Sequence, residues 1–526
     1  MITTSDAWKE AHLEAVIPEA FIEITYDITE PGLQSSASQE NNGVMEFAQP
    51  AEILDSTNKA HPQYATLEQN MWGLDGKSTV LPDTAPYGDT GYVSSMVVGS
   101  GTPTVRILLS EVHTQPIPGI TITWSSKYNE YAAKFRVSAY NGSTQIYSQE
   151  YTNSTVKTVC EFTLSSYTEI RIEVLEWCLP NHRARIEKVF LGIATTFTKS
   201  DIFSYSHSQS GDLLSAELPK NSVSFSLNNV DGMWNPDNLS GNAMYLAEQQ
   251  QIFVRYGLLL GDDIEWINAG TFWISEWDTP TNGLEVRFVA RDMIEFMSEK
   301  YTGIRSGTLY DIAIAALEQA VIPTQDNGAL RYEIDDVLKL STVDFSAEET
   351  TYTIAEIIQL CANAACCVMY QDRNGVLHIE PLQQNASGYA IRKYVSYAHP
   401  EFTFSKPLRS VTVNDGLGTV ENSTTGEVQT VSNSLITNAT MARRVAEWVR
   451  NTLKERKTIS GEYRADPTLD VFDKIAIESK YGANNAVYIT EIEYTFNGSF
   501  KGRYLGRVTN FDAEKWYSGE LISGEV

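Results

Sequence analysis

Short strand-like runs separated by turns are the feature that most restricts how this chain can fold. Between residues 104 and 177, apolar and polar side chains alternate in runs such as TVRILLSEV (104–112) and EIRIEVLEW (169–177). Successive side chains of a strand point to opposite faces, so each run predicts a strand with one buried face. Turn signals such as Asn141-Gly142 separate the runs. Strands at this spacing are typical of a β-sandwich.

Similar runs lie on both sides of this region. FIEITYDI (21–28) precedes it, and SVSFSLNNV (222–230), QIFVRYGLLL (251–260) and AVYITEIEYTF (486–496) follow it. Each run alternates over most of its length, which again indicates strands with one buried face. We therefore expect a mainly β chain, and its 526 residues predict several domains.

Helical periodicity is restricted to a few segments, which supply minor α+β parts. Thr308 with Asp311, and Thr353 with Glu356, have the spacing of helix N-caps, and Thr353 with Glu356 forms a capping box. The predicted helices cover residues 5–16, 306–321, 353–365 and 438–455.

The charge balance excludes one large class of partner. The chain has 67 acidic and 39 basic side chains, a formal net charge of −28. A surface of this sign repels nucleic acid and offers no basic stripe for phosphate contacts, so sequence-specific nucleic-acid binding is not expected. An acidic surface suits a conduit through which DNA slides without sticking, although most acidic proteins are merely soluble.

No targeting or membrane signal is recognisable. The start of the chain, MITTSDAWKEAHLEAV, has no basic segment followed by an apolar one, as a secretory signal would. No apolar run approaches the ~20 residues that span a bilayer, so no integral membrane segment is expected. We expect synthesis in the cytoplasm and release by lysis or in a particle.

The sequence offers no recognisable catalytic or cofactor motif. The seven histidines are scattered without helical i, i+4 pairs, and no GxSxG, GxxxxGK[ST] or strand-linked GxGxxG motif occurs. The five cysteines are irregularly spaced, unlike a zinc site or a disulfide framework. We therefore predict no catalytic residue, no metal site and no cofactor, and hence a protein that is not an enzyme.

One acidic stretch, GEYRADPTLDVFDKIAI (461–477), has three alternative interpretations: a catalytic carboxylate pair, an RAD adhesion tripeptide, or a turn between strands. Pro467 ends strand pairing because it lacks an N–H donor. Short polar side chains such as Asp470 bond the local backbone in turns. We interpret Asp466, Pro467, Asp470 and Asp473 as a structural turn in which each aspartate has a local backbone role.

Loop aromatics are the candidates for sugar binding. Trp72, Tyr87 and Tyr92 lie in loop-like text and could stack on a carbohydrate. Partial burial at a strand edge is the alternative for each of them.

Three parts of the chain carry a family resemblance. HPQYATLEQNMWGLDGK (61–77) resembles a segment that opens a galactose-binding-like (discoidin-like) β-sandwich in tail proteins of phages and prophages of Gram-positive bacteria. EWINAGTFWISEW (265–277) resembles the first barrel domain of tail hub (tail-associated, baseplate hub) proteins. GEYRADPTLDVFDKIAIESKYG (461–482) is similar to the closing β-domain of the same hubs.

The resemblance implies a fold and a domain order. The fold would be a multi-domain hub of β-barrel domains, interrupted by a jelly-roll-like sandwich. Residues 1–45 would hold an N-terminal helix and the first hub strand, and 46–196 the inserted sandwich. Residues 197–304 would continue hub barrel 1, 305–390 would form an α+β hub domain, and 391–526 the second hub barrel with helix 438–455.

The resemblance also implies a function. Such hubs are homotrimers that close the tail tube, with two barrels per chain giving pseudo-sixfold symmetry. The implied partners are distal tail or tube proteins, the C-terminus of the tape measure protein, and tail fibres or receptor-binding proteins. The implied location is the tail tip or baseplate of the virion, assembled in the host cytoplasm, and the ring would open for DNA.

Two alternatives remain open. The sandwich would bind a host cell-wall glycan if the chain acts as a carbohydrate-binding adhesin or receptor-binding tail protein. A cell-wall hydrolase would need a placed pair of carboxylates, and the sequence identifies none.

Overall fold

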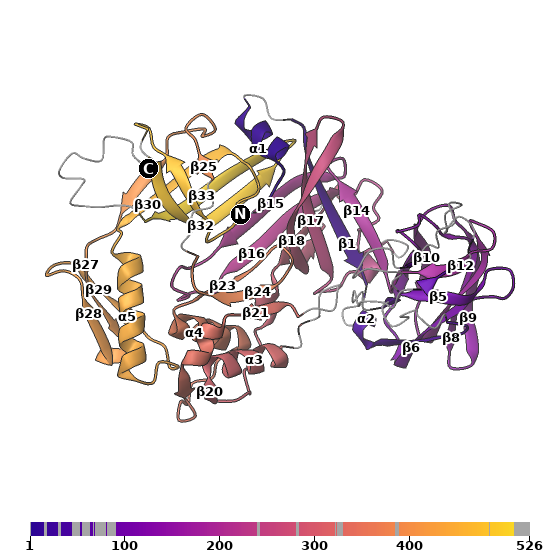
Figure 1. Cartoon of the computed structure of the whole chain (residues 1–526), viewed down its shortest axis with the longest axis horizontal. Coiled ribbons are helices and arrows are strands. Elements are labelled where there is room, and N and C mark those ends of the chain that lie inside the picture. Colours follow the sequence, from indigo (N-terminus) through magenta and orange to yellow (C-terminus); the bar gives the residue numbers. More distant parts are fainter. Residues whose placement is uncertain are drawn as a thin grey trace.

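A 13-stranded sheet runs through the centre of the computed structural model of the chain (Figure 1). The structure describes residues 2–14, 18–29, 33–44, 53–54, 64–66, 68, 80–81, 91–238, 242–279, 283–320, 322, 330–383, 389–482 and 484–509. The strand order is β14 (Ile193–Thr198), β1 (Ala20–Ile28), β17 (Gln251–Leu260), β18 (Asp263–Asp278), β19 (Glu285–Arg291), β16 (Lys220–Asn228), β15 (Ile202–Ser210), β32 (Asn484–Phe496), β33 (Phe500–Val508), β30 (Lys457–Arg464) and β26 (Glu401–Phe404). Off this path, β31 (Lys474–Glu478) pairs with β32 and with β25 (Ala390–Ile391).

The sheet contains the same five-strand unit twice. In the first half-sheet the order is β17-β18-β19-β16-β15, and in the second it is β31-β32-β33-β30-β26. All four pairings within each half-sheet are antiparallel, and the strands follow in the same chain order. Even a register irregularity recurs, between Ile274 and Glu276 in β18 and between Ile489 and Glu491 in β32. The chain therefore carries a structural duplication.

The two half-sheets share one apolar core, and the alternation predicted from the sequence explains it. Along β1, buried and half-buried residues alternate from Ala20 to Ile28. Strands from both half-sheets contribute buried residues to the same cluster, including Phe225, Tyr256, Ile492 and Tyr504. Helix α1 (Asp6–Leu13), capped by Ser5, adds its buried Trp8.

A β-sandwich is inserted between β1 and β14, which pair antiparallel and so bring its two ends together. It has its own core, which includes Leu33, Trp124, Phe135 and Trp177, and it forms a separate lobe in Figure 1. Its elements are α2 (Leu33–Ser36), β2 (Ala37–Asn41), β3 (Tyr64–Ala65), β4 (Val80–Leu81), β5 (Tyr92–Val97), β6 (Thr104–His113), β7 (Ile117–Thr123), β8 (Ala132–Asn141), β9 (Thr144–Thr152), β10 (Lys157–Leu164), β11 (Tyr167–Trp177), β12 (Arg183–Ile186) and β13 (Lys188–Phe190). Since β2 pairs with β6, the sandwich begins before residue 46.

A third core holds most of the helices. Helix α5 packs here with α3 and α4, because its apolar face, including Met441 and Val445, contacts this cluster. From the sequence, residues 438–455 were instead expected to belong to the second barrel. The elements are η3 (Met293–Phe296), β20 (Ser306–Thr308), α3 (Leu309–Gln319), β21 (Tyr332–Ile334), η4 (Asp336–Leu340), β22 (Thr342–Asp344), α4 (Ile354–Ala365), β23 (Val368–Gln371), β24 (Leu377–Glu380), β27 (Leu408–Val413), η5 (Asn414–Gly416), β28 (Gly418–Glu421), β29 (Glu427–Val431) and α5 (Ala439–Leu453), while η2 (Asn242–Tyr245) lies outside it. The prediction of a mainly β, multi-domain fold with α+β parts is confirmed.

The predicted caps of α3 and α4 are confirmed. Thr353 accepts a hydrogen bond from the Glu356 N–H, and the Glu356 side chain accepts one from the Thr353 N–H. Thr308 and Asp311 form the same reciprocal pair at α3. We expect Thr353→Ala to lower the free energy of unfolding by about 1 kcal/mol, since helix N–H groups lose their partner. Chemical denaturation measures this, with Thr353→Ser as the control that keeps the hydroxyl and should retain most of the stability.

Candidate functional site

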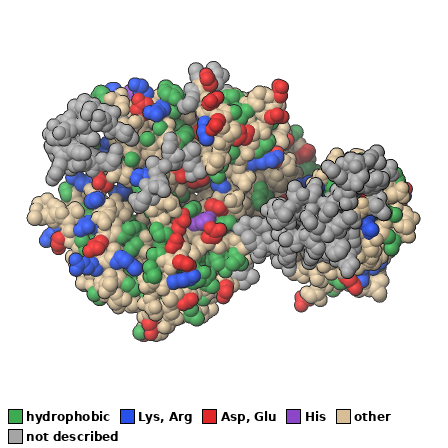
Figure 2. Space-filling view, viewed as in Figure 1, with side chains coloured by type: hydrophobic (Ala, Val, Ile, Leu, Met, Phe, Trp, Pro, Cys, Tyr) green, Lys and Arg blue, Asp and Glu red, His purple; other side chains and the backbone are tan. Residues whose placement is uncertain are grey.

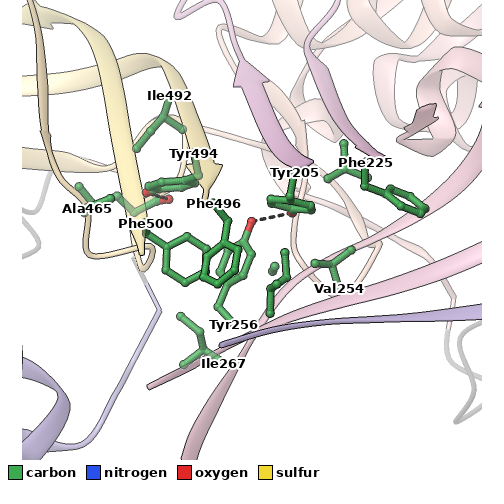
Figure 3. Packing of buried hydrophobic residues seen from close by; sticks show 14 of the residues in the cluster. Tyr205, Phe225, Val254, Tyr256, Ile267, Ala465, Ile492, Tyr494, Phe496 and Phe500 are labelled. Carbon is green, nitrogen blue, oxygen red and sulfur yellow. Dashed lines mark hydrogen bonds between the residues drawn. The ribbon is translucent and has the colours of Figure 1, made fainter. Parts of the chain in front are cut away.

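The two half-sheets meet where β15 pairs antiparallel with β32, from Tyr205 opposite Phe496 to Ser210 opposite Glu491. Aromatic side chains from both halves line this junction (Figure 3), and the rings of Tyr256 and Phe500 lie 4.6 Å apart between centroids. The Tyr205 and Tyr256 hydroxyls are 2.8 Å apart. The junction is therefore a continuous part of the core rather than a cleft between domains.

A buried histidine lies at the centre of this junction. The Nδ1 atom of His207 lies 2.8 Å from the Tyr256 hydroxyl, and its Nε2 atom lies 2.8 Å from Asn221 Oδ1. With the imidazole neutral, Nε2–H can donate to Asn221 and Nδ1 can accept from the Tyr256 hydroxyl, so both contacts are satisfied without a charge on the ring. Burial, helped by the charge of Arg373, lowers the pKa of His207 to about 4. The junction thus holds a histidine that stays uncharged at neutral pH.

The low pKa of His207 predicts a dependence of stability on pH. The unfolded chain binds this proton below pH ~6.5, but the folded chain does so only below about 4. Stability contributed by neutral His207 should therefore fall as pH decreases from ~6.5 to 4, by up to about 3 kcal/mol. We expect His207→Gln to remove this part of the slope in urea titrations across that range. Asp292, whose burial raises its pKa to about 7, acts with the opposite sign in both proteins and cancels in the difference. Equal slopes for both proteins would contradict the assignment.

An ion pair between a buried arginine and a half-buried aspartate ties the α+β core to the junction. Arg373, in the turn between β23 and β24, directs Nε at both carboxylate oxygens of Asp470, at 2.9 and 3.0 Å. Its other nitrogens donate to the carbonyls of Asn268 and Leu469. Gln209 Nε2 also donates to Asp470, at 3.0 Å. Burial is the largest influence and would raise the pKa of Asp470, but the Arg373 charge together with the hydrogen bonds from Gln209 and Arg373 and other favourable charge contacts holds the pKa below its ordinary value.

The predicted turn at residues 466–473 lies at this same corner, but it does more than turn the chain. Asp473 has the expected local role, since its Oδ2 accepts from the Asp470 N–H at 2.8 Å. Asp466 and Asp470 do not, because their carboxylates bond distant parts of the chain. Asp466 accepts from Trp8 Nε1 at 3.0 Å. Phe472 has a φ of 68°, a left-handed conformation that costs a bulky residue about 1–3 kcal/mol and indicates a tightly constrained corner.

Neither Arg373 nor His207 could be recognised from the sequence as a candidate site residue. Arg373 lies in a plain Asp-Arg-Asn-Gly turn, and its partner is far away in the chain. His207 alternates with serines in SYSHSQS (204–210). The only available signal was that alternation, which places His207 on the same buried face as Tyr205 and Gln209.

The described geometry is that of a structural joint. Within the described ranges, no group of three or more His, Cys, Asp or Glu side chains could hold a metal ion. The same part of the chain contains no helix that is both long and apolar enough to cross a bilayer. On the face drawn in Figure 2, basic and acidic side chains are interspersed, without a continuous basic stripe. What the site can do is hold the half-sheets and the α+β core in one fixed arrangement.

The three aromatic candidates for sugar binding do not form a site. Tyr92 is fully buried in the sandwich core, and its hydroxyl donates to the Asn42 carbonyl at 3.2 Å. The interpretation of Tyr92 as a stacking surface is therefore wrong, because its ring, at the start of β5, is one of the buried side chains of the sandwich core. Trp72 and Tyr87 lie outside the described residues.

The fold thus defines a mainly β, multi-domain protein built on a duplicated half-sheet. No family model and no curated protein matches the chain. Among solved structures, it is similar to a 43 kDa tail protein of prophage MuSo2 from Shewanella oneidensis, with 13% identity, 59% of this chain and 93% of that chain covered, and a TM-score of 0.41. It is similar to a tail protein from Neisseria meningitidis, with 10% identity, 60% and 93% coverage, and a TM-score of 0.43. It is also similar to the prophage tail protein gp18 from Listeria monocytogenes, with 12% identity, 62% and 95% coverage, and a TM-score of 0.35. At these scores the likenesses are remote and assign no function by themselves.

Proposed function

We propose that this chain is the structural hub at the tip of a bacteriophage-type tail, where three copies form a closed ring. The duplicated half-sheet carries this proposal. Two equivalent units are already joined edge to edge through β15 and β32, so further copies can extend the same arrangement around an axis. Three copies would present six similar units, which fits the pseudo-sixfold hub that the sequence resembles.

In this role the protein is a building block rather than an enzyme. The ring closes the tail tube, contacts distal tail or tube proteins, and holds the C-terminus of the tape measure protein. It connects the tube to tail fibres or receptor-binding proteins at the tail tip, after assembly in the host cytoplasm. The net charge of −28 supports passage of DNA, because an acidic wall does not bind phosphates.

The inserted sandwich adds a second part to the proposal. It is a separate lobe beside β14 in Figure 1, where an insertion can face outward without disturbing the ring. We assign to it a contact with host-surface glycan, and Trp72 and Tyr87 remain the candidate residues. A glycan array with the full chain tests this role, and binding that survives Trp72→Ala with Tyr87→Ala would remove these residues from it.

Packing suggests small changes to the expected domain limits. The sandwich would start at about residue 33, where Leu33 joins its core, rather than at 46. Residues of α5 would belong with the α+β core, as an insertion between β26 and β30. For the other domains we keep the limits expected from the sequence.

Mass photometry of the purified full chain tests the hub directly. The proposal predicts a species of three chains, with no further growth as the concentration rises. A chain that remains monomeric at every concentration would contradict it.

A further inference from the structure

The duplication shows which strands occupy matching positions. In β15, His207 lies opposite Val223 and Gln209 opposite Asn221. In β26, Phe402 and Phe404 have the matching places opposite Ile459 and Lys457 of β30. Since β16 corresponds to β30, β26 is the second copy of β15.

The other side of the junction has a counterpart as well. In β32, Ile492 lies opposite Tyr504 and Glu493 opposite Arg503. In β18, Trp277 lies opposite Phe288 and Asp278 opposite Arg287. The shared irregularity just before these pairs fixes the match, so the end of β18 is the first copy of the part of β32 that meets β15.

Burial differs sharply between the matching positions. At the junction within the chain, His207, Gln209 and Ile492 are 0%, 4% and 1% exposed. Their counterparts Phe402, Phe404 and Trp277 are 36%, 46% and 37% exposed. As far as the described residues go, β26 pairs only with β30, and residues 275–278 of β18 pair only with β19. Large aromatic side chains on two strand edges are what an interface leaves exposed in a single copy.

We propose that β26 of one copy pairs with the end of β18 in the next copy, repeating between copies the β15–β32 contact made within each chain. This inference rests on the proposed hub and names the surfaces that close its ring. The internal register places Gln209 opposite Ile492 and Ser208 opposite Glu493. The equivalent register between copies places Phe404 opposite Trp277 and Thr403 opposite Asp278.

Continuity with the internal junction favours a second copy as the occupant, because the two edges repeat the surfaces that β15 and β32 already join within each chain. The charged side chains beside these edges have partners within one copy, Glu276 with Arg291 and Lys406 with Glu427. Trp277 also lines a surface groove of about 340 Å³ with Ser224, Phe225 and Ser226. A groove of this size beside the edge has room for an aromatic side chain from β26.

A designed disulfide tests the register. Residues directly opposite each other in an antiparallel pair have Cβ atoms about 4.5–5.5 Å apart, close enough for bridging after a small adjustment. We expect the double variant Thr403→Cys with Asp278→Cys to run as a covalent trimer on non-reducing gels after mild oxidation. The wild type, each single variant, and Asp278→Cys with Thr419→Cys, an exposed residue of β28, should remain monomeric on the same gel.

A second variant tests the same interface without relying on cysteine oxidation. Phe404→Asp should weaken self-association at least about tenfold, as loss of a central aromatic anchor does. The matched control Tyr481→Asp changes a residue that is 89% exposed and outside both edges, and it should leave association unchanged. Trimers in solution with neither the crosslink nor the Phe404 effect would overturn this interface and leave the hub intact. Monomers at every concentration would overturn both.

Discussion

Replacing Asp470 by alanine should lower the free energy of unfolding by about 3–5 kcal/mol, among the largest losses we expect from a single side chain. Arg373 is almost completely buried and bonds both Asp470 oxygens. Removing the carboxylate leaves the guanidinium charge in the core without its counter-ion, which is much worse than removing the pair together. Thermal and urea unfolding of the purified chain measure the loss.

The double variant Arg373→Met with Asp470→Leu is the matched control, because it removes both charges and fills the space with apolar atoms. It should recover most of the stability that Asp470→Ala loses. Asp473→Asn should lose less, about 1 kcal/mol, since an amide oxygen can still accept from the Asp470 N–H. If Asp470→Ala and Asp473→Asn were equally mild, the ion pair would not be the element that fixes this corner.

The second large effect should come from Trp8→Ala, with a loss of about 3–5 kcal/mol. Trp8 is 1% exposed and packs into the shared core. Its indole N–H donates to the buried Asp466, so alanine removes apolar contacts and a hydrogen-bond donor at once. The neighbouring Ser5 N–H bonds Glu265 of β18, and the Ile2 N–H bonds the Thr468 carbonyl. Helix α1 therefore fastens the first half-sheet to the 466–473 corner.

Trp8→Phe separates the two contributions, because it keeps most of the apolar contact and removes only the indole N–H. It should lose about 1–3 kcal/mol, the effect of leaving Asp466 with one partner fewer. Lys9→Ala, on the exposed side of the same helix, should change stability by less than about 0.5 kcal/mol. A Trp8→Ala protein as stable as the Lys9→Ala protein would show that α1 is dispensable.

Local pattern was enough to predict the fold class, but not the duplication. Alternation in FIEITYDI and the capping box at Thr353 depend on neighbours in sequence, so strands and helix starts could be predicted. The two half-sheets match in pairing but differ in residues: His207 corresponds to Phe402, and Trp277 to Ile492. The segment between β26 and β30 also carries α5 and three strands, whereas β15 and β16 are joined by a short loop.

The joint itself could not be predicted for a different reason. Asp470 reads as a turn residue because turns favour short polar side chains, and nothing nearby reveals that Arg373 reaches it. The prediction for Tyr92 failed for the opposite reason: the sequence around it resembles an exposed loop, but its ring is buried in the sandwich core. Side-chain partners far apart in the chain and burial at strand ends are set by packing, which local periodicity does not encode.

In the proposed hub, the duplicated half-sheets of three copies build a closed ring. Electron microscopy of the purified full chain can show this ring. We expect end-on averages with three sandwich lobes around a ring of six similar β units and an open or plugged centre. Averages that show single chains, open filaments or a two-fold dimer would contradict it.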